Sequence, residues 1–216
     1  PLNLLIEIVE KDTDNPVQPS VGPEVAAMFK SELAAAGDAA AQLALCRKEL
    51  DNLERKNYWR KIYAMTHLAE TLGAKAFDDI SPFLGHEHWR IREHANQVAV
   101  ELVKGGAGDQ LVKLFETAQA RESGLLGNWN AAGILHALAS AATAEKVASS
   151  ASSWIPAALS SAKAALKHND PVVRKAAVET VFTIGGNAEL KTVFAFMRSV
   201  AKEDEDFHGA ELALLS

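Results

Sequence analysis

One pattern recurs along the chain and constrains its fold more than any other feature. A basic residue stands three positions before a small residue, and apolar or small residues follow that small residue at four and eight positions. We call the small residue the anchor of each copy. Three copies fit well: Lys61 with anchor Ala64, Leu68 and Leu72; Arg92 with anchor Ala95, Ala99 and Val103; and Arg174 with anchor Ala177, Val181 and Gly185. Such steps fall on one face of a helix, so each copy predicts an amphipathic helix with a small residue on its buried side.

Two weaker copies extend the pattern. The segment from Trp129 to Ser140 fits loosely, with Gly133 in the anchor position and Ala137 four residues on. A further copy begins at Phe207 with Ala210 as its anchor. Successive anchors are separated by about 30 to 45 residues, which is the range of helical repeats.

A second amphipathic helix is expected after each first helix. The expected ranges are 75–83, 109–118, 153–167 and 188–200, and glycine- or proline-containing turns separate them from the first helices. One helix pair cannot bury its apolar stripe alone, whereas stacked pairs bury a continuous core. The sequence therefore predicts pairs of helices packed side by side.

The best-formed copy covers residues 169–177. Asp170 is expected to cap the helix, Pro171 to occupy its first turn, and Arg174 to bond carboxylates or carbonyls at a neighbouring turn. This stretch resembles the first helix of a HEAT repeat. The short spacing of the first two copies resembles the phycobilisome-lyase-type subgroup of that family. The resemblance covers residues 57–216 and implies an all-α fold, a right-handed α-solenoid of about four to five helical hairpins with an N-terminal helical extension.

The expected organisation has two parts. Residues 1–22 form an N-terminal segment that is partly extended, because residues 11–22 are rich in Asp, Asn, Pro and Gly. Residues 23–216 form a single HEAT-like domain, with clear repeats from about residue 57. Pro23 is expected to start a helix that Gly37 ends, and Asp38 to cap the next helix.

Composition and charge exclude several classes of function. The net charge of −6 argues against a non-specific nucleic-acid binder, which normally carries a basic surplus, although a local basic stripe is compatible with it. No apolar run is as long as a membrane span. The single cysteine, Cys46, cannot form an intramolecular disulfide; it reads as a small buried side chain and favours a reducing intracellular compartment, cytoplasmic or organellar.

No residue set predicts catalysis or a cofactor. His86, His88 and His94 form the only metal-like cluster, but a repeat junction is where polar residues belong, and we expect structural or solvated histidines. Iron-binding HEAT hydroxylases carry repeated His-Glu pairs, and here His86-Glu87 is the only one. The serines of residues 139–163 lack a matching His or Asp.

Tryptophan and arginine side chains near the starts of the first helices are the candidate partner-binding residues. Tryptophan and arginine are the residue types that most often anchor interfaces. The candidates are Trp59, Arg60, Trp89, Arg90, Arg92 and Trp129. The competing interpretation is that each tryptophan packs over the preceding turn. The sequence favours a non-catalytic protein-binding scaffold or assembly subunit. The alternative, from the resemblance, is a bilin-lyase-like or chaperone-like protein whose cavity is lined by Tyr58, Trp59, Trp89, Arg92 and His94.

Overall fold

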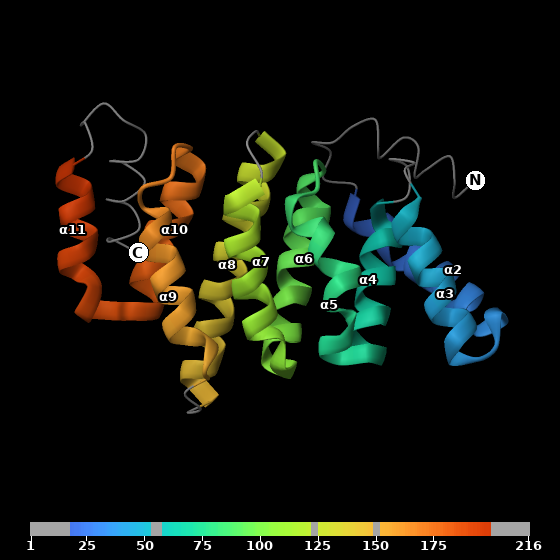
Figure 1. Ribbon diagram of the computed structural model, residues 1–216. Helices are drawn as coiled ribbons and strands as arrows, with labels where there is room; N and C mark the ends of the chain where they lie inside the picture. Colours follow the sequence, from blue (N-terminus) through green and yellow to red (C-terminus); the bar gives the residue numbers. More distant parts are fainter. Residues whose placement is uncertain (1–17, 53–57, 122–124, 149–151, 200–216) are drawn as a thin grey trace. The chain divides into compact units, whose positions relative to one another are not determined.

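The computed structural model describes residues 18–52, 58–121, 125–148 and 152–199 (Figure 1). Every regular element in these ranges is helical and none is a strand, which confirms the predicted all-α class. The chain forms two compact units, residues 1–72 and 73–216, which we describe separately. The expected copy at Phe207 and most of the expected N-terminal segment lie outside the described residues.

The first unit contains three helices that contact one another, α2 (Gln18–Ala36), α3 (Ala39–Asp51) and α4 (Tyr58–Leu72). As predicted, α2 ends at Gly37, whose φ of 92° is accessible to glycine at little cost. Asp38 caps α3 by accepting a 2.9 Å hydrogen bond from the amide of Ala41. Helix α2 begins at Gln18 rather than at Pro23, so residues 18–22, which we expected to be extended, are helical.

Apolar side chains from all three helices form the core of this unit. Buried side chains of α2 stand at a spacing of four, and buried side chains of α3 and α4 face them. The buried residues are Val25, Phe29 and Leu33 in α2, Cys46 and Leu50 in α3, and Tyr58, Ile62, Ala64, Met65 and Leu68 in α4. The spacing along α2 is that of a single helix face, so burial follows from the amphipathic pattern.

The second unit alternates longer helices with short turns. Its elements are η2 (Gly73–Ala76), α5 (Phe77–Ile80), η3 (Ser81–Gly85), α6 (Trp89–Leu102), η4 (Val103–Ala107), α7 (Gly108–Arg121), α8 (Leu125–Ala148), α9 (Trp154–Ala165), α10 (Pro171–Gly185), η5 (Gly186–Glu189) and α11 (Leu190–Ser199).

Two predicted second helices differ in detail from the structure. The expected helix 75–83 is broken into α5 and flanking 3₁₀ turns, because Pro82 lacks the N–H that a continuous α-helix needs at that point. The chain also turns sharply at Gly106, where φ is 107°, and so separates α6 from α7. Helices α7, α9 and α11 match the remaining predicted ranges to within a few residues.

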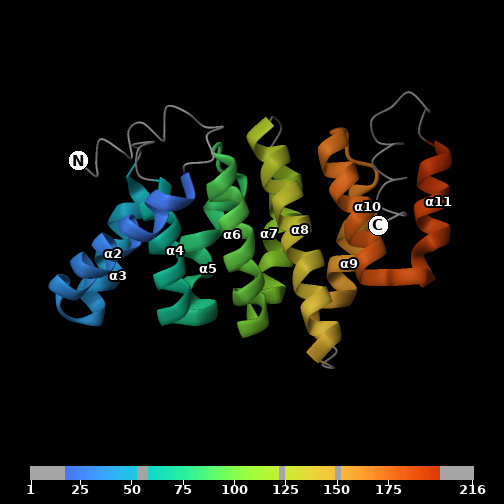
Figure 2. The same ribbon diagram turned by 180° about the vertical axis from the view of Figure 1, so that it is seen from behind.

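First helices and second helices pack in an ordered way within the second unit. Helix α8 lies between α6 and α10 and contacts both, as the two opposite views show (Figures 1 and 2). Helix α9 contacts both α7 and α10, and α7 contacts α8. Each inner helix of the unit therefore buries its apolar stripe against the helices that precede and follow it in the chain.

The anchors are buried as the pattern predicts. Ala64, Ala95 and Ala177 are each 0% exposed, and Gly133 is also buried. The residues four positions later, Leu68, Ala99, Ala137 and Val181, are buried as well. A small residue at the anchor lets the neighbouring element approach closely.

The basic residue three positions before each alanine anchor makes the same type of contact in all three copies. Arg92 donates from Nη1 to the backbone oxygens of His86 (2.7 Å) and Glu87 (2.9 Å). Arg174 donates from Nη1 to those of His168 (2.7 Å) and Asn169 (2.8 Å). We call a basic side chain that donates to two consecutive carbonyls a basic clamp.

In the first unit, Lys61 forms the corresponding clamp. Its Nζ donates to the backbone oxygens of Glu49 (3.1 Å) and Leu50 (2.5 Å), which belong to the last turn of α3. Burial lowers the pKa of Lys61, and the negative charges of Glu49 and Asp51 oppose that shift. The clamp therefore couples consecutive helices through the backbone of the earlier one.

A histidine before each arginine clamp completes the match between α6 and α10. His86 Nδ1 accepts a 3.0 Å hydrogen bond from the amide of His88, and His168 Nδ1 accepts a 3.0 Å bond from the amide of Asp170. The two junctions thus share two side-chain contacts of the same geometry, although Trp89 opens one helix and Pro171 the other.

Candidate functional site: a groove between α6 and α8

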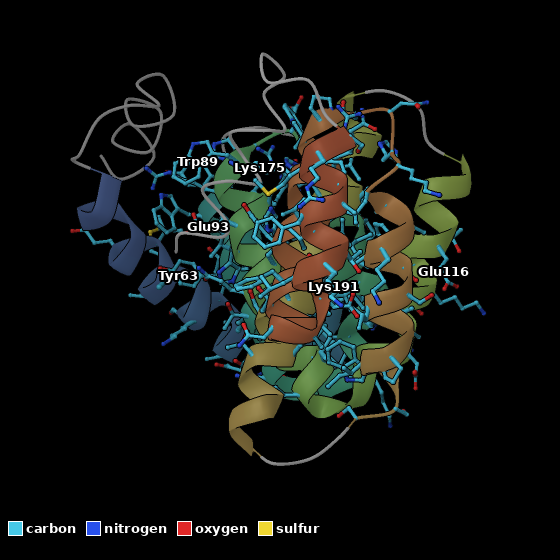
Figure 3. The ribbon with its side chains drawn as sticks, turned by 90° about the vertical axis from the view of Figure 1, so that its left-hand side faces the viewer. Tyr63, Trp89, Glu93, Glu116, Lys175 and Lys191 are labelled. Carbon is cyan, nitrogen blue, oxygen red and sulfur yellow. The ribbon has the colours of Figure 1, made fainter. Side chains whose placement is uncertain are left out.

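Four outward-facing side chains of α6 form one stripe along the helix. Trp89, Glu93, Gln97 and Glu101 follow one another at a spacing of four and are all exposed. Trp89 is 49% exposed, although tryptophan is highly buried on average. Trp89 and Glu93 lie on the same side of α6 (Figure 3).

A groove of about 530 Å³ runs between this stripe and α8. From α8 it is lined by His136 and Ser140, two exposed residues one turn apart. The full lining consists of Trp89, Arg92, Glu93, Asn96, Gln97, Val100, Glu101, His136 and Ser140. The volume falls in the range of small-molecule and peptide-side-chain sites, and most lining groups can form hydrogen bonds.

Gly133 lets α8 come close to η3 and to Asn96, a residue of α6 that lines the groove. A Cβ at this position would lie 2.7 Å from the backbone oxygen of Leu84 and 3.5 Å from the side-chain amide of Asn96. Glycine therefore takes the place of the anchor alanine in this copy.

Arg92 lines the groove and also contacts α8 and the junction before α6. Its guanidinium lies over the ring of Trp129 in α8, with 4.3 Å between Cζ and the ring centroid. Burial lowers the pKa of Arg92 below its usual range, but an arginine keeps its charge at any physiological pH. Because Nη1 donates hydrogen bonds to the backbone oxygens of residues 86 and 87, Arg92 acts mainly to hold α6, the preceding junction and α8 together.

The remaining charges of the groove are mostly paired, with one exception. Glu101 accepts from Lys104 at 2.6 Å, and His136 Nδ1 lies 3.3 Å from a carboxylate oxygen of Glu179 in α10. Within the ranges that the structure describes, Glu93 forms no ion pair. The wall next to Trp89 therefore carries a carboxylate with no counter-charge.

The predicted partner-binding residues fall into two groups. In the second unit, Trp89 and Arg92 line the groove, Arg90 stacks on the Trp89 ring at 4.7 Å, and Trp129 supports Arg92 from α8. The structure brings these four side chains to one place.

The other two predicted residues belong to the first unit and make contacts within it. Arg60 forms a bidentate pair with Glu32 (2.9 and 2.6 Å) and donates from Nε to Glu49 at 3.0 Å. Trp59 stacks near Tyr63, with 6.3 Å between ring centroids. These contacts tie the three helices of the first unit together, and a role for either residue at an interface stays a prediction.

The histidine cluster and the single cysteine are the candidate reactive groups from the sequence. His86 Nδ1 serves the backbone of its own junction, and no group of three potential ligands among the described residues is placed to hold a metal ion. Burial and the nearby Glu49 raise the pKa of the Cys46 thiol to about 11, so this thiol is protonated and a poor nucleophile near neutral pH. Cys46 is buried, as expected.

Sequence reasoning missed most of the polar lining of the groove. Glu93, Gln97, His136 and Ser140 belong to no motif. Only the spacing of four within each pair, Glu93 with Gln97 and His136 with Ser140, could have placed each pair on one helix face. Of the residues expected around a bilin, Trp89 and Arg92 line the groove, whereas Tyr58 and Trp59 belong to the first unit.

Comparison with known proteins gives no relative. No protein-family model, no curated protein and no solved structure matches this chain. None of the described helices is sufficiently long and apolar to span a bilayer.

Proposed function

We propose that this chain is a HEAT-like α-solenoid that binds another protein through the exposed surface of its first helices. What supports this most is the repeated junction, in which Arg92 and Arg174 clamp two carbonyls at 2.7 to 2.9 Å while a histidine caps the same turn. Equivalent contacts at two junctions are expected of repeated units, and repeated units present extended surfaces suited to binding macromolecules.

The groove between α6 and α8 is the part of that surface best suited to a partner. It combines an exposed tryptophan with polar side chains that can hydrogen bond a peptide, and its walls stand on rigid helices supported by the Arg92–Trp129 contact. Exposed aromatic residues over a firmly packed base are typical of interface hot spots.

Site-specific photo-crosslinking tests this proposal. A photoreactive amino acid replaces Gln97 in the groove, and a matched variant carries it at Lys113, an exposed residue of α7 outside the groove. Both full-length variants are expressed in the native source and irradiated. We expect a discrete covalent partner from position 97 that Trp89→Ala abolishes, and no such adduct from position 113. Adducts of equal yield at both positions, or none at position 97, would contradict the proposal.

A further inference from the structure

We propose that the groove between α6 and α8 receives a lysine or arginine side chain from an extended segment of the partner. The cation would lie between the indole of Trp89 and the carboxylate of Glu93. This inference rests on the proposed protein-binding function and adds the chemistry of what enters the site.

The charges that line the groove favour a cation. Arg92 donates from Nη1 to two backbone oxygens and lies with its guanidinium against Trp129, and within the described part of the chain it forms no ion pair with Glu93. His136 faces Glu179, and Glu101 faces Lys104. The carboxylate of Glu93 is left without a counter-charge among the described residues, and a basic side chain would supply it.

Trp89 supplies the second element of a cation site. It is one helical turn from Glu93 on the same face of α6, and its ring already holds a guanidinium, that of Arg90, at 4.7 Å. Since Trp89 is still 49% exposed in that arrangement, ring surface is left for a further cation. Indole is the best aromatic partner for a cation, and a nearby carboxylate adds to the attraction.

The rest of the lining suits the backbone of an extended segment. Gln97 and Ser140 stand on opposite walls and can both donate and accept hydrogen bonds. The groove, at about 530 Å³, is larger than a single side chain requires, so a few neighbouring residues of the partner can enter with the basic one. An acidic segment would instead meet the uncompensated charge of Glu93.

Binding of defined peptides tests the inference. Three fluorescein-labelled Gly/Ser decapeptides contain three lysines, three glutamates or three glutamines, and fluorescence anisotropy measures their affinity for the full chain at low salt. The variants are Glu93→Gln and Trp89→Phe. Glu70→Gln, an exposed residue of α4, is the control for the same loss of charge outside the groove.

We expect the lysine peptide alone to bind measurably, and Glu93→Gln to weaken it about five-fold while Glu70→Gln changes its affinity less than two-fold. Trp89→Phe should weaken binding by a smaller factor, because phenylalanine attracts a cation less than tryptophan does. Equal binding of the three peptides, or an equal effect of Glu93→Gln and Glu70→Gln, overturns the inference. If crosslinking from position 97 still captures a partner in that case, the protein-binding function stands and only the cation preference is wrong.

Discussion

Arg92 of α6 places its guanidinium 4.3 Å from the ring centroid of Trp129 in α8, while its Nη1 holds the carbonyls of residues 86 and 87. One side chain therefore joins α6, α8 and the junction that precedes α6. Arg174 makes the same two carbonyl contacts. The pair offers a matched comparison of the clamp with and without the contact to Trp129.

Removing either clamp should destabilise the second unit. Hydrogen bonds from a charged donor contribute about 2 kcal/mol, so we expect Arg174→Ala to lower the free energy of unfolding by roughly that amount. Arg92→Ala should cost about 1 kcal/mol more because it also removes the contact with Trp129. Urea denaturation of both variants, followed by circular dichroism, measures the difference. An unchanged free energy of unfolding for either variant would contradict the role of its clamp.

The stabilisation that His168 contributes should come from its hydrogen-bond acceptor atom rather than from the packing of its ring. In His168→Asn, the side-chain oxygen can still accept from the amide of Asp170, and we expect stability close to that of the original chain. His168→Ala leaves that amide without its side-chain acceptor and should cost about 1 kcal/mol. Thermal unfolding of the two variants under the same buffer compares them directly. A destabilised Asn variant would point to ring packing as the main contribution.

Gly133 should not tolerate even one added carbon atom. The Cβ of alanine would meet the carbonyl oxygen of Leu84 at 2.7 Å, and a backbone atom cannot turn aside as a flexible side chain can. We expect Gly133→Ala to destabilise the unit by about 1–3 kcal/mol, although alanine favours helices over glycine. The control is Gly105→Ala, where the nearest atoms lie at ordinary contact distance. Equal unfolding midpoints for the two variants would contradict the close approach.

Acid should weaken the first unit through Glu32. Arg60, by its hydrogen bonds above all, lowers the pKa of Glu32 below the usual carboxyl range of about 4.3. A lowered folded-state pKa means that the stabilisation is complete above the unfolded-state value and disappears as the pH falls through the folded-state value. Glu32 is partly exposed, so the contribution is below about 1 kcal/mol. Glu32→Gln should flatten the pH dependence of unfolding below pH 5, measured by urea titration at each pH; an unchanged slope would exclude this pair as its source.

Cys46 should be inert until the chain unfolds. Burial raises the pKa of its thiol to about 11, so little thiolate exists near pH 7.5 and the sulfur is also shielded. We expect iodoacetamide to leave the native chain unmodified, as measured by intact mass, and to label it once in urea. Rapid labelling of the folded chain would show that α3 opens readily.

The sequence by itself determined the buried faces of the first helices and the boundary between α2 and α3. Ala64, Ala95 and Ala177 are buried because apolar side chains at helical spacing must leave water together, and that spacing can be read directly. Gly37 and Asp38 end one helix and begin the next through local backbone chemistry that involves only their neighbours.

Only the tertiary structure decided where the groove lies and which side chains line it. His136 and Glu93 are far apart in the chain and face one groove because Gly133 lets α8 approach the turn at Leu84 and the side chain of Asn96. The role of Arg92 depended on long-range contacts in the same way, since its contact with Trp129 exists only once α6 and α8 have packed. Helix periodicity reports burial, but it carries no information about which helices meet, because contacts between distant segments depend on the shapes and volumes of both.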